Sequence, residues 1–111
     1  MKYFLYNLTE KPVITAFRFP SNLIEGMSVI VTCSVLEGDP PIKVDWLKDG
    51  HKLDTAFLNI HRNEMGDLGS SLVFRNIGQN HAGNYTCVAK NEVGQDMYSS
   101  DMVVKRKCVI C

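Results

Sequence analysis

Four cysteines are the residues of this 111-residue sequence whose type and spacing could do chemistry. Cys33 and Cys87 lie in the body of the chain, and Cys108 and Cys111 form a Cys-x-x-Cys motif near its end. Such a motif is typical of thiol–disulfide exchange or of half a zinc site. Exchange motifs open a helix in a β–α–β unit, and zinc needs two further ligands, neither of which the sequence predicts. We therefore interpret residues 107–111 as a tail, with a disulfide to a second copy or to flanking sequence as the alternative.

The three histidines, His51, His61 and His81, are the other candidates for catalysis. An enzyme needs a nucleophile, a base and a group that orients the base within one pocket. No histidine has a serine or cysteine partner in a recognisable motif, and no phosphate-binding glycine pattern occurs. The acidic residues from Glu64 to Asp67 are too few for a calcium site. We predict a protein that is not an enzyme, with no metal, no cofactor and no small-molecule substrate, and with all three histidines solvated at the surface.

Composition excludes two further kinds of function. Lys and Arg number 12, as do Asp and Glu, so the formal net charge is +0, without the basic surface of a nucleic-acid-binding domain. No apolar run approaches the 18 residues of a transmembrane helix, and the run Tyr3–Tyr6 is too short for a secretory signal.

Met1–Glu10 is interpreted as an N-terminal extension or as sequence foreign to the domain. We expect one domain over residues 11–106, with another protein surface as its partner.

Apolar and polar residues alternate with a period of two in several short runs, which is typical of β-strands with one buried face. Turns rich in Gly, Asp and Pro separate these runs, and no segment has a helical pattern with caps. Pro20 splits the first strand, because proline cannot donate to a strand ladder, and the two parts can pair with different sheets. The predicted strands cover residues 13–19, 21–25, 27–36, 42–48, 51–53, 57–62, 70–76, 84–91 and 96–105.

The spacing of Cys33, Trp46, Tyr85 and Cys87 indicates how these strands pack. Both cysteines fall on the inward side of their strands, so they can form a disulfide across a core about 10 Å thick, with the Trp46 indole beside them. Tyr85 precedes the second cysteine by two residues, as in the tyrosine corner of such domains. The sequence therefore predicts an all-β fold, an immunoglobulin-like antiparallel β-sandwich with Greek-key connections.

Three motifs make this sequence resemble the intermediate (I-set) immunoglobulin domains of adhesion molecules. They are Trp46-Leu47-Lys48-Asp49-Gly50, Ala82-Gly83-Asn84-Tyr85-Thr86-Cys87 and Ala89-Lys90-Asn91-Glu92-Val93-Gly94. Further matches narrow the resemblance to the arthropod Dscam (Down syndrome cell adhesion molecule) family, above all its seventh immunoglobulin domain and the first domain of the shortened chelicerate forms. These matches are Pro12-Val13-Ile14 with Phe17, Gly38-Asp39-Pro40-Pro41-Ile42 and His81-Ala82-Gly83-Asn84. The resemblance covers about residues 11–105.

The resemblance implies two sheets, ABED and A'GFC, in an extracellular part of a single-pass cell-surface protein with neighbouring immunoglobulin domains. It also implies isoform-specific homophilic binding in trans, with two copies pairing antiparallel through the ABED sheet. One position departs from the I-set pattern: His81 stands where an aspartate usually pairs with an arginine. We therefore expect Arg62 to lack that partner and His81 to hydrogen-bond locally.

The outward residues of the ABED sheet are the candidate homophilic interface, because Ile30 and Val73 are apolar and their neighbours are polar. The opposite sheet is expected to be a solvated face, with Lys43, Asp45, Thr86, Val88 and Lys90 outward. The candidate interface residues are Ile30, Thr32, Asn59, His61, Ser71, Val73 and Arg75.

Two sequons, at Asn7 and Asn84, are candidate glycosylation sites, and Asn84 is expected to point outward. Together with the expected disulfide they favour an oxidising, extracellular setting. Two alternatives share the fold: a structural I-set domain of a giant muscle cytoskeletal protein, and a ligand-binding domain of a heterophilic receptor.

Overall fold

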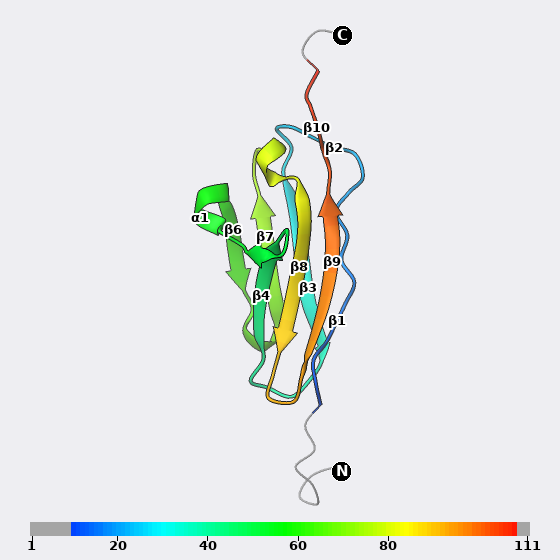
Figure 1. The fold of residues 1–111 in the computed structure, drawn as a ribbon, viewed down its shortest axis with the longest axis vertical. Helices are drawn as coiled ribbons and strands as arrows, with labels where there is room; N and C mark the ends of the chain where they lie inside the picture. The colour runs from blue at the N-terminus through cyan, green and yellow to red at the C-terminus, as the bar shows by residue number, and fades with distance from the viewer. Residues whose placement is uncertain (1–9, 109–111) are drawn as a thin grey trace, which may run out of the picture.

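In the computed structural model, which describes residues 10–108, two four-stranded sheets pack face to face (Figure 1). The strand order of the first sheet is β1-β3-β7-β6, which corresponds to A, B, E and D. Its strands are β1 (Val13–Ile14), β3 (Val29–Glu37), β7 (Gly69–Phe74) and β6 (Ile60–Glu64).

The second sheet has the order β5-β4-β8-β9. Its strands are β5 (His51–Lys52), β4 (Lys43–Lys48), β8 (Gly83–Lys90) and β9 (Gln95–Met102). Every pairing within the two sheets is antiparallel, so the predicted immunoglobulin-like sandwich is confirmed.

The split first strand divides its pairing as expected, although its ordered parts are shorter than predicted. β1 pairs with β3, and β2 (Leu23–Ile24) pairs in parallel with β10 (Val104–Lys105), which follows β9. Residues 15–22, which include Pro20, form no strand. Their backbone is held at isolated points instead: the Thr15 amide donates to the Ser34 carbonyl (3.0 Å), and the Phe19 amide donates to the Ser100 hydroxyl (3.4 Å).

The core lies between the sheets and follows the inward parity of the strands. Trp46, Leu72 and Phe74 are almost completely buried. Phe17 packs edge-on against the Trp46 ring (centroids 5.4 Å apart), so the irregular first segment also contributes to the core. No helix among the described residues is long and apolar enough to cross a membrane.

One short helix was not predicted, and it replaces the first part of the strand expected at residues 57–62. α1 (Thr55–Leu58) begins after Asp54, whose carboxylate accepts a hydrogen bond from the Phe57 amide (3.0 Å). It ends at Asn59, which adopts a left-handed conformation (φ 56°). A helix of four residues is too short to produce a hydrophobic period, which is why the sequence pattern missed it. Figure 1 shows α1 beside β6 at one edge of the sandwich.

Candidate recognition surface

The two sheets are joined in the core by a disulfide and by a chain of hydrogen bonds. Cys33 on β3 and Cys87 on β8 form the expected disulfide, and both are fully buried beside Trp46. The Trp46 indole Nε1 donates to the Ser70 hydroxyl on β7 (3.0 Å), and this hydroxyl donates to the Glu64 carboxylate (2.9 Å). The buried polar groups are therefore satisfied, and they fix the distance between the sheets that carry the surface.

The tyrosine corner is present, and it involves a buried histidine rather than a solvated one. The Tyr85 hydroxyl donates to the His81 carbonyl (2.6 Å), and burial raises the pKa of Tyr85. The His81 side chain is only 5% exposed and packs edge-on against Phe74. Its Nδ1 accepts a hydrogen bond from the Gly78 amide (2.9 Å), so Nε2 carries the proton and donates to the Leu58 carbonyl (2.7 Å).

The prediction of a solvated His81 is therefore wrong, whereas the expected local hydrogen bonding is confirmed. The His81 ring thus links the Leu58 carbonyl, at the end of α1, to the turn before β8. Burial depends on this contact between distant segments, which strand parity does not encode. His51 and His61 are exposed, as expected.

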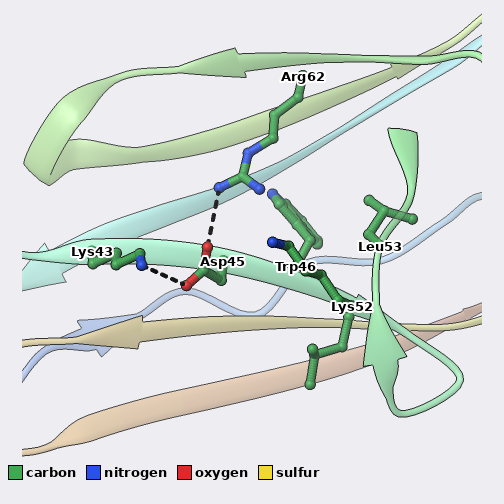
Figure 2. A pocket seen from close by; sticks show the side chains of 7 residues that line it. Lys43, Asp45, Trp46, Lys52, Leu53 and Arg62 are labelled. Carbon is green, nitrogen blue, oxygen red and sulfur yellow. Dashed lines mark ion pairs between the residues drawn. The ribbon is translucent and has the colours of Figure 1, made fainter. Parts of the chain in front are cut away.

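Arg62 makes no contact with position 81, as expected, because the His81 ring bonds to Gly78 and Leu58, and it finds other partners instead. Its guanidinium pairs with Glu64, lies 3.8 Å from Asp45 on β4, and donates to the Val44 carbonyl. Figure 2 shows Arg62 reaching from β6 toward Asp45 along the edge between the sheets. The hydrogen bonds from Arg62, and then those from Ser70, hold the pKa of Glu64 below its usual value of 4.5.

This edge encloses a hollow of about 270 Å³, in which Lys43 lies 3.9 Å from Asp45. Lys43 and Arg62 thus both lie beside carboxylates of the same chain. No group of three or more His, Cys, Asp or Glu side chains within residues 10–108 is placed to hold a metal ion. The hollow is lined by Lys43, Asp45, Trp46, Leu47, Lys52, Leu53 and Arg62.

The outward face of the β1-β3-β7-β6 sheet, here called the recognition face, brings most of the candidate interface residues together. Ile30, Val73 and His61 occupy one row across β3, β7 and β6, and Thr32 and Ser71 share the next row. Ile30 is 65% exposed and Val73 is half-buried beside it. The Thr32 and Ser71 hydroxyls are hydrogen-bonded to each other (3.0 Å), which leaves a polar row next to the apolar one.

Asn59 is exposed near this face but lies in the turn that precedes β6, not on a strand as predicted. It lines a hollow of about 370 Å³ together with Arg75. The full lining is Asn59, Ile60, His61, Val73 and Arg75. We call Ile30, Val73 and Arg75 the upper end of the recognition face.

Sequence reasoning missed the other end of this face, called here the lower end, which comprises Leu36 and Leu68. They are 64% and 69% exposed, and both line one hollow of about 240 Å³ at the end of the sandwich. Leu36 has the same parity as Ile30 on β3, which was the signal available. Leu68 belongs to a 3₁₀ turn before β7 (Gly66–Leu68), and only the fold places it beside Leu36.

The outward face of the β5-β4-β8-β9 sheet differs from the prediction at one position. Thr86 is buried rather than solvated, because its hydroxyl bonds to Ser99 (2.7 Å) and the flanking strands cover it. Lys43 and Lys90 are exposed, and Asp45 and Val88 are half-buried.

Asn84 lies at the end of this face, partly exposed. Its side-chain amide donates to Asp101 (2.9 Å), and its backbone amide donates to Asp49 (2.9 Å), which lowers the pKa of Asp49. Asn7 and Cys111 lie outside the described residues, and Cys108 is disulfide-bonded.

Comparisons with known proteins agree with this architecture. The model of the family described as "Immunoglobulin domain" matches residues 11–91. The chain is 38% identical over 94 residues to the cell adhesion molecule Dscam2 of Drosophila melanogaster, a stretch that covers 85% of this chain and 4% of that protein. The chain thus spans only a small part of such curated relatives.

Two solved structures have similar folds. One is the Dscam1 Ig7 domain, isoform 5, with a TM-score of 0.81 and 26% identity, covering 86% of this chain and 97% of that chain. The other is the I-band fragment I67-I69 from titin, with a TM-score of 0.77 and 26% identity, covering 87% of this chain and 33% of that chain.

Proposed function

The chain belongs to the immunoglobulin domain family and is homologous to the domains of Dscam cell adhesion molecules, a non-enzymatic kind of module; from this premise we propose that it binds a second copy of itself through the recognition face. The binding is homophilic and isoform-specific, and it joins receptors on opposed cells. The module is extracellular, belongs to the ectodomain of a single-pass membrane protein, and has further immunoglobulin domains as neighbours.

The observation that supports this proposal most directly is the row formed by Ile30, Val73 and His61. An apolar residue that is 65% exposed stands beside a half-buried one, with polar residues around both. Isolated exposed apolar residues are common, but a paired row with a polar rim has the anatomy of a small protein interface. Residues on such a face can vary without disturbing the core, because their side chains point away from it. That freedom suits isoform-specific recognition.

The disulfide favours an extracellular adhesion module over a structural domain of a muscle cytoskeletal protein. Titin domains share the fold, but a buried disulfide persists in an oxidising compartment and is rare in the cytosol. A heterophilic receptor remains the second candidate, since it shares both fold and compartment and differs only in the surface that binds.

The test is a charge placed on the face. Val73→Glu puts a carboxylate into both halves of a two-fold contact, so we expect self-association to weaken by at least about tenfold. Val88→Glu on the opposite sheet is the matched control, because Val88 is also a half-buried strand valine. Light scattering over a wide concentration range reports association, and thermal melting reports folding. If Val88→Glu abolishes association and Val73→Glu does not, the binding surface is on the opposite sheet and the proposed face is wrong.

We also propose that Asn84 carries an N-linked glycan. Its side chain is partly exposed at the end of a strand, and the sequon Asn84-Tyr85-Thr86 is complete. Expression in secretory cells should give a mass shift that glycosidase treatment removes and that Asn84→Gln abolishes. An unshifted wild-type mass would contradict the proposal.

Residues 11–106 are proposed as the folding unit. Glu10 and Lys107 both make backbone contacts with the domain, through Asp39 (2.7 Å) and Glu25 (3.1 Å), so a chain limited to residues 11–106 should melt slightly lower than the 111-residue chain. We expect a decrease of less than about 5 °C, because these bonds are exposed. A much larger decrease would show that the ends belong to the packed unit.

A further inference from the structure

The hollow of about 270 Å³ at the edge between the two sheets, here called the edge recess, holds polar groups that the chain leaves without partners. Trp46 and Leu53 form part of its apolar wall, and the Leu53 amide donates to the Trp46 carbonyl (3.1 Å). The edge is open because β5, which ends one sheet, has only two residues. In addition, α1 replaces the start of β6, which ends the other sheet.

Arg62 presents one side of its guanidinium to the edge recess. Its Nε and Nη2 both donate to the Glu64 carboxylate, and Nη2 also donates to the Val44 carbonyl. These bonds fix the plane of the guanidinium, and the side chain is only 27% exposed. Nη1 makes no hydrogen bond to any residue from 10 to 108, and Figure 2 shows this nitrogen directed toward Trp46. The two N–H groups of Nη1 are therefore donors held in place for a ligand.

Lys52 adds a second positive charge to the same recess. It is exposed on β5, and within the described part of the chain its amino group takes part in no ion pair. Figure 2 shows that the side chains of Lys52 and Arg62 both end beside Trp46. A guanidinium and an ammonium thus approach the recess from two different strands, and together they can donate to one anion.

Asp45 places acceptors beside these donors. Its two carboxylate oxygens lie 3.8 Å from Arg62 Nη2 and 3.9 Å from Lys43 Nζ, which is too far for hydrogen bonds. The side chain is 51% exposed, so its oxygens can accept from hydroxyl groups of a ligand. Glu64 lies behind Arg62, so three cations (Lys43, Lys52 and Arg62) face two carboxylates, and the local charge favours a ligand with one negative charge.

We propose that the edge recess binds a sugar residue that carries a carboxylate, such as a uronic acid within a glycan. The sugar carboxylate accepts from Arg62 Nη1 and Lys52 Nζ, and sugar hydroxyl groups donate to Asp45. The volume suits a single sugar ring, since pockets for larger ligands measure about 300–1,000 Å³. An acidic side chain of a protein has no hydroxyl group for Asp45 and is repelled by it, so the sugar matches the recess better.

The edge recess lies off the recognition face, so this site does not depend on self-association. Arg62 follows the outward residue His61 on β6, and its side chain reaches the opposite sheet at Asp45. One copy of the chain therefore contains every group of the site, and a glycan can be held while the recognition face contacts a second copy. A single sugar makes few contacts, so we expect a dissociation constant of about 1 mM or more.

A matched pair of sugars tests the proposal. Methyl glucuronide carries a carboxylate where methyl glucoside carries a hydroxymethyl group. Nuclear magnetic resonance of the isotope-labelled 111-residue chain should show saturable shifts at Lys52, Leu53 and Arg62 with the glucuronide and none with the glucoside. Lys52→Gln should weaken glucuronide binding by about fivefold or more, because it removes a charged donor. Lys105→Gln removes an exposed lysine on β10, away from the recess, and is the control that should bind as the wild type does.

Asp45→Ala distinguishes a sugar site from a site for any small anion. It removes the acceptor for the hydroxyl groups, so the affinity for glucuronide should fall by about threefold or more. The affinity for acetate, which has a carboxylate but no hydroxyl group, should stay the same or rise, because a negative charge is lost. Thermal melting of each variant checks that the fold is intact.

Three results would overturn the proposal. Glucuronide that shifts no signal of the recess at tens of millimolar would show that there is no site. Acetate that binds as tightly as glucuronide, with no effect of Asp45→Ala on their ratio, would show that the recess takes only an anion. A short acidic peptide that binds more tightly than glucuronide would assign the recess to a protein ligand. Each of these results would leave the proposed self-association standing, because Val73→Glu tests a different surface.

Discussion

The inward and outward residues of the same strands make different contributions to this protein. On β3 and β7, Cys33 and Leu72 point inward and are completely buried, whereas their neighbours Thr32 and Val73 point outward. The inward residues meet partners from the opposite sheet, and the outward ones meet solvent or another molecule. One period-two pattern therefore serves both stability and recognition, and side-chain parity separates the two roles.

Removal of the disulfide should cause the largest loss of stability among changes to the inward residues. Cys33 and Cys87 are 54 positions apart, and closing a loop of that length stabilises a fold by about 4 kcal/mol in the chain-entropy model. The double variant Cys33→Ala/Cys87→Ala should lose stability of this order in urea unfolding. Ile30→Thr, on the outward side of β3, should change it by less than about 0.5 kcal/mol. Equal losses of stability in the two variants would contradict the division between inward and outward residues.

Adjacent residues on β7 give a sharper contrast. Leu72 is 0% exposed, so Leu72→Ala should lower the free energy of unfolding by about 3 kcal/mol through lost packing and a residual cavity. Val73→Ala should cost less than about 1 kcal/mol and should affect self-association instead. Denaturant unfolding combined with light scattering measures both quantities. The prediction fails if Val73→Ala destabilises the fold as much as Leu72→Ala does.

The tyrosine corner tests a single inward hydrogen bond. Tyr85→Phe removes the donor to the His81 carbonyl and leaves this buried acceptor unpaired, at a cost of about 1–2 kcal/mol. Tyr98→Phe is the control, since the Tyr98 ring packs on the core but its hydroxyl makes no hydrogen bond within residues 10–108. Thermal melting should separate the two variants by several degrees. A Tyr98 variant that melts as low as the Tyr85 variant would count against the corner.

The smallest effect is expected at Glu64, where the interior chain of hydrogen bonds reaches solvent. Its pKa lies below 4.5 because Arg62 and Ser70 donate to the carboxylate, so the stabilisation is present above about pH 4.5 and is lost as the pH falls through the lower native value. The carboxylate is half exposed and screened, so Glu64→Gln should cost less than about 1 kcal/mol at pH 7. The difference between the two proteins should shrink as the pH falls below 4.5. A difference that is constant with pH would contradict the assignment.

Much of the fold follows from local patterns in the sequence. Alternation predicts the major strands and their buried faces, since each residue of a strand points to the side opposite its neighbour. For the same reason the parity of Cys33 and Cys87, with Trp46 and Tyr85, predicts the disulfide and the sandwich. Of the recognition face, the sequence identifies Ile30, Thr32, Ser71 and Val73, which are outward residues of long strands.

The rest depends on which distant segments meet, and strand parity contains no information about that. His81 is buried because Leu58 and Phe74 pack around its ring, and Arg62 finds partners because β4 passes beneath it. Leu68 joins Leu36 only because the turn before β7 folds back to the end of β3. The sandwich, its core and the upper end of the recognition face thus follow from the sequence pattern alone. The lower end exists only in the folded chain, because two short segments create it by lying side by side.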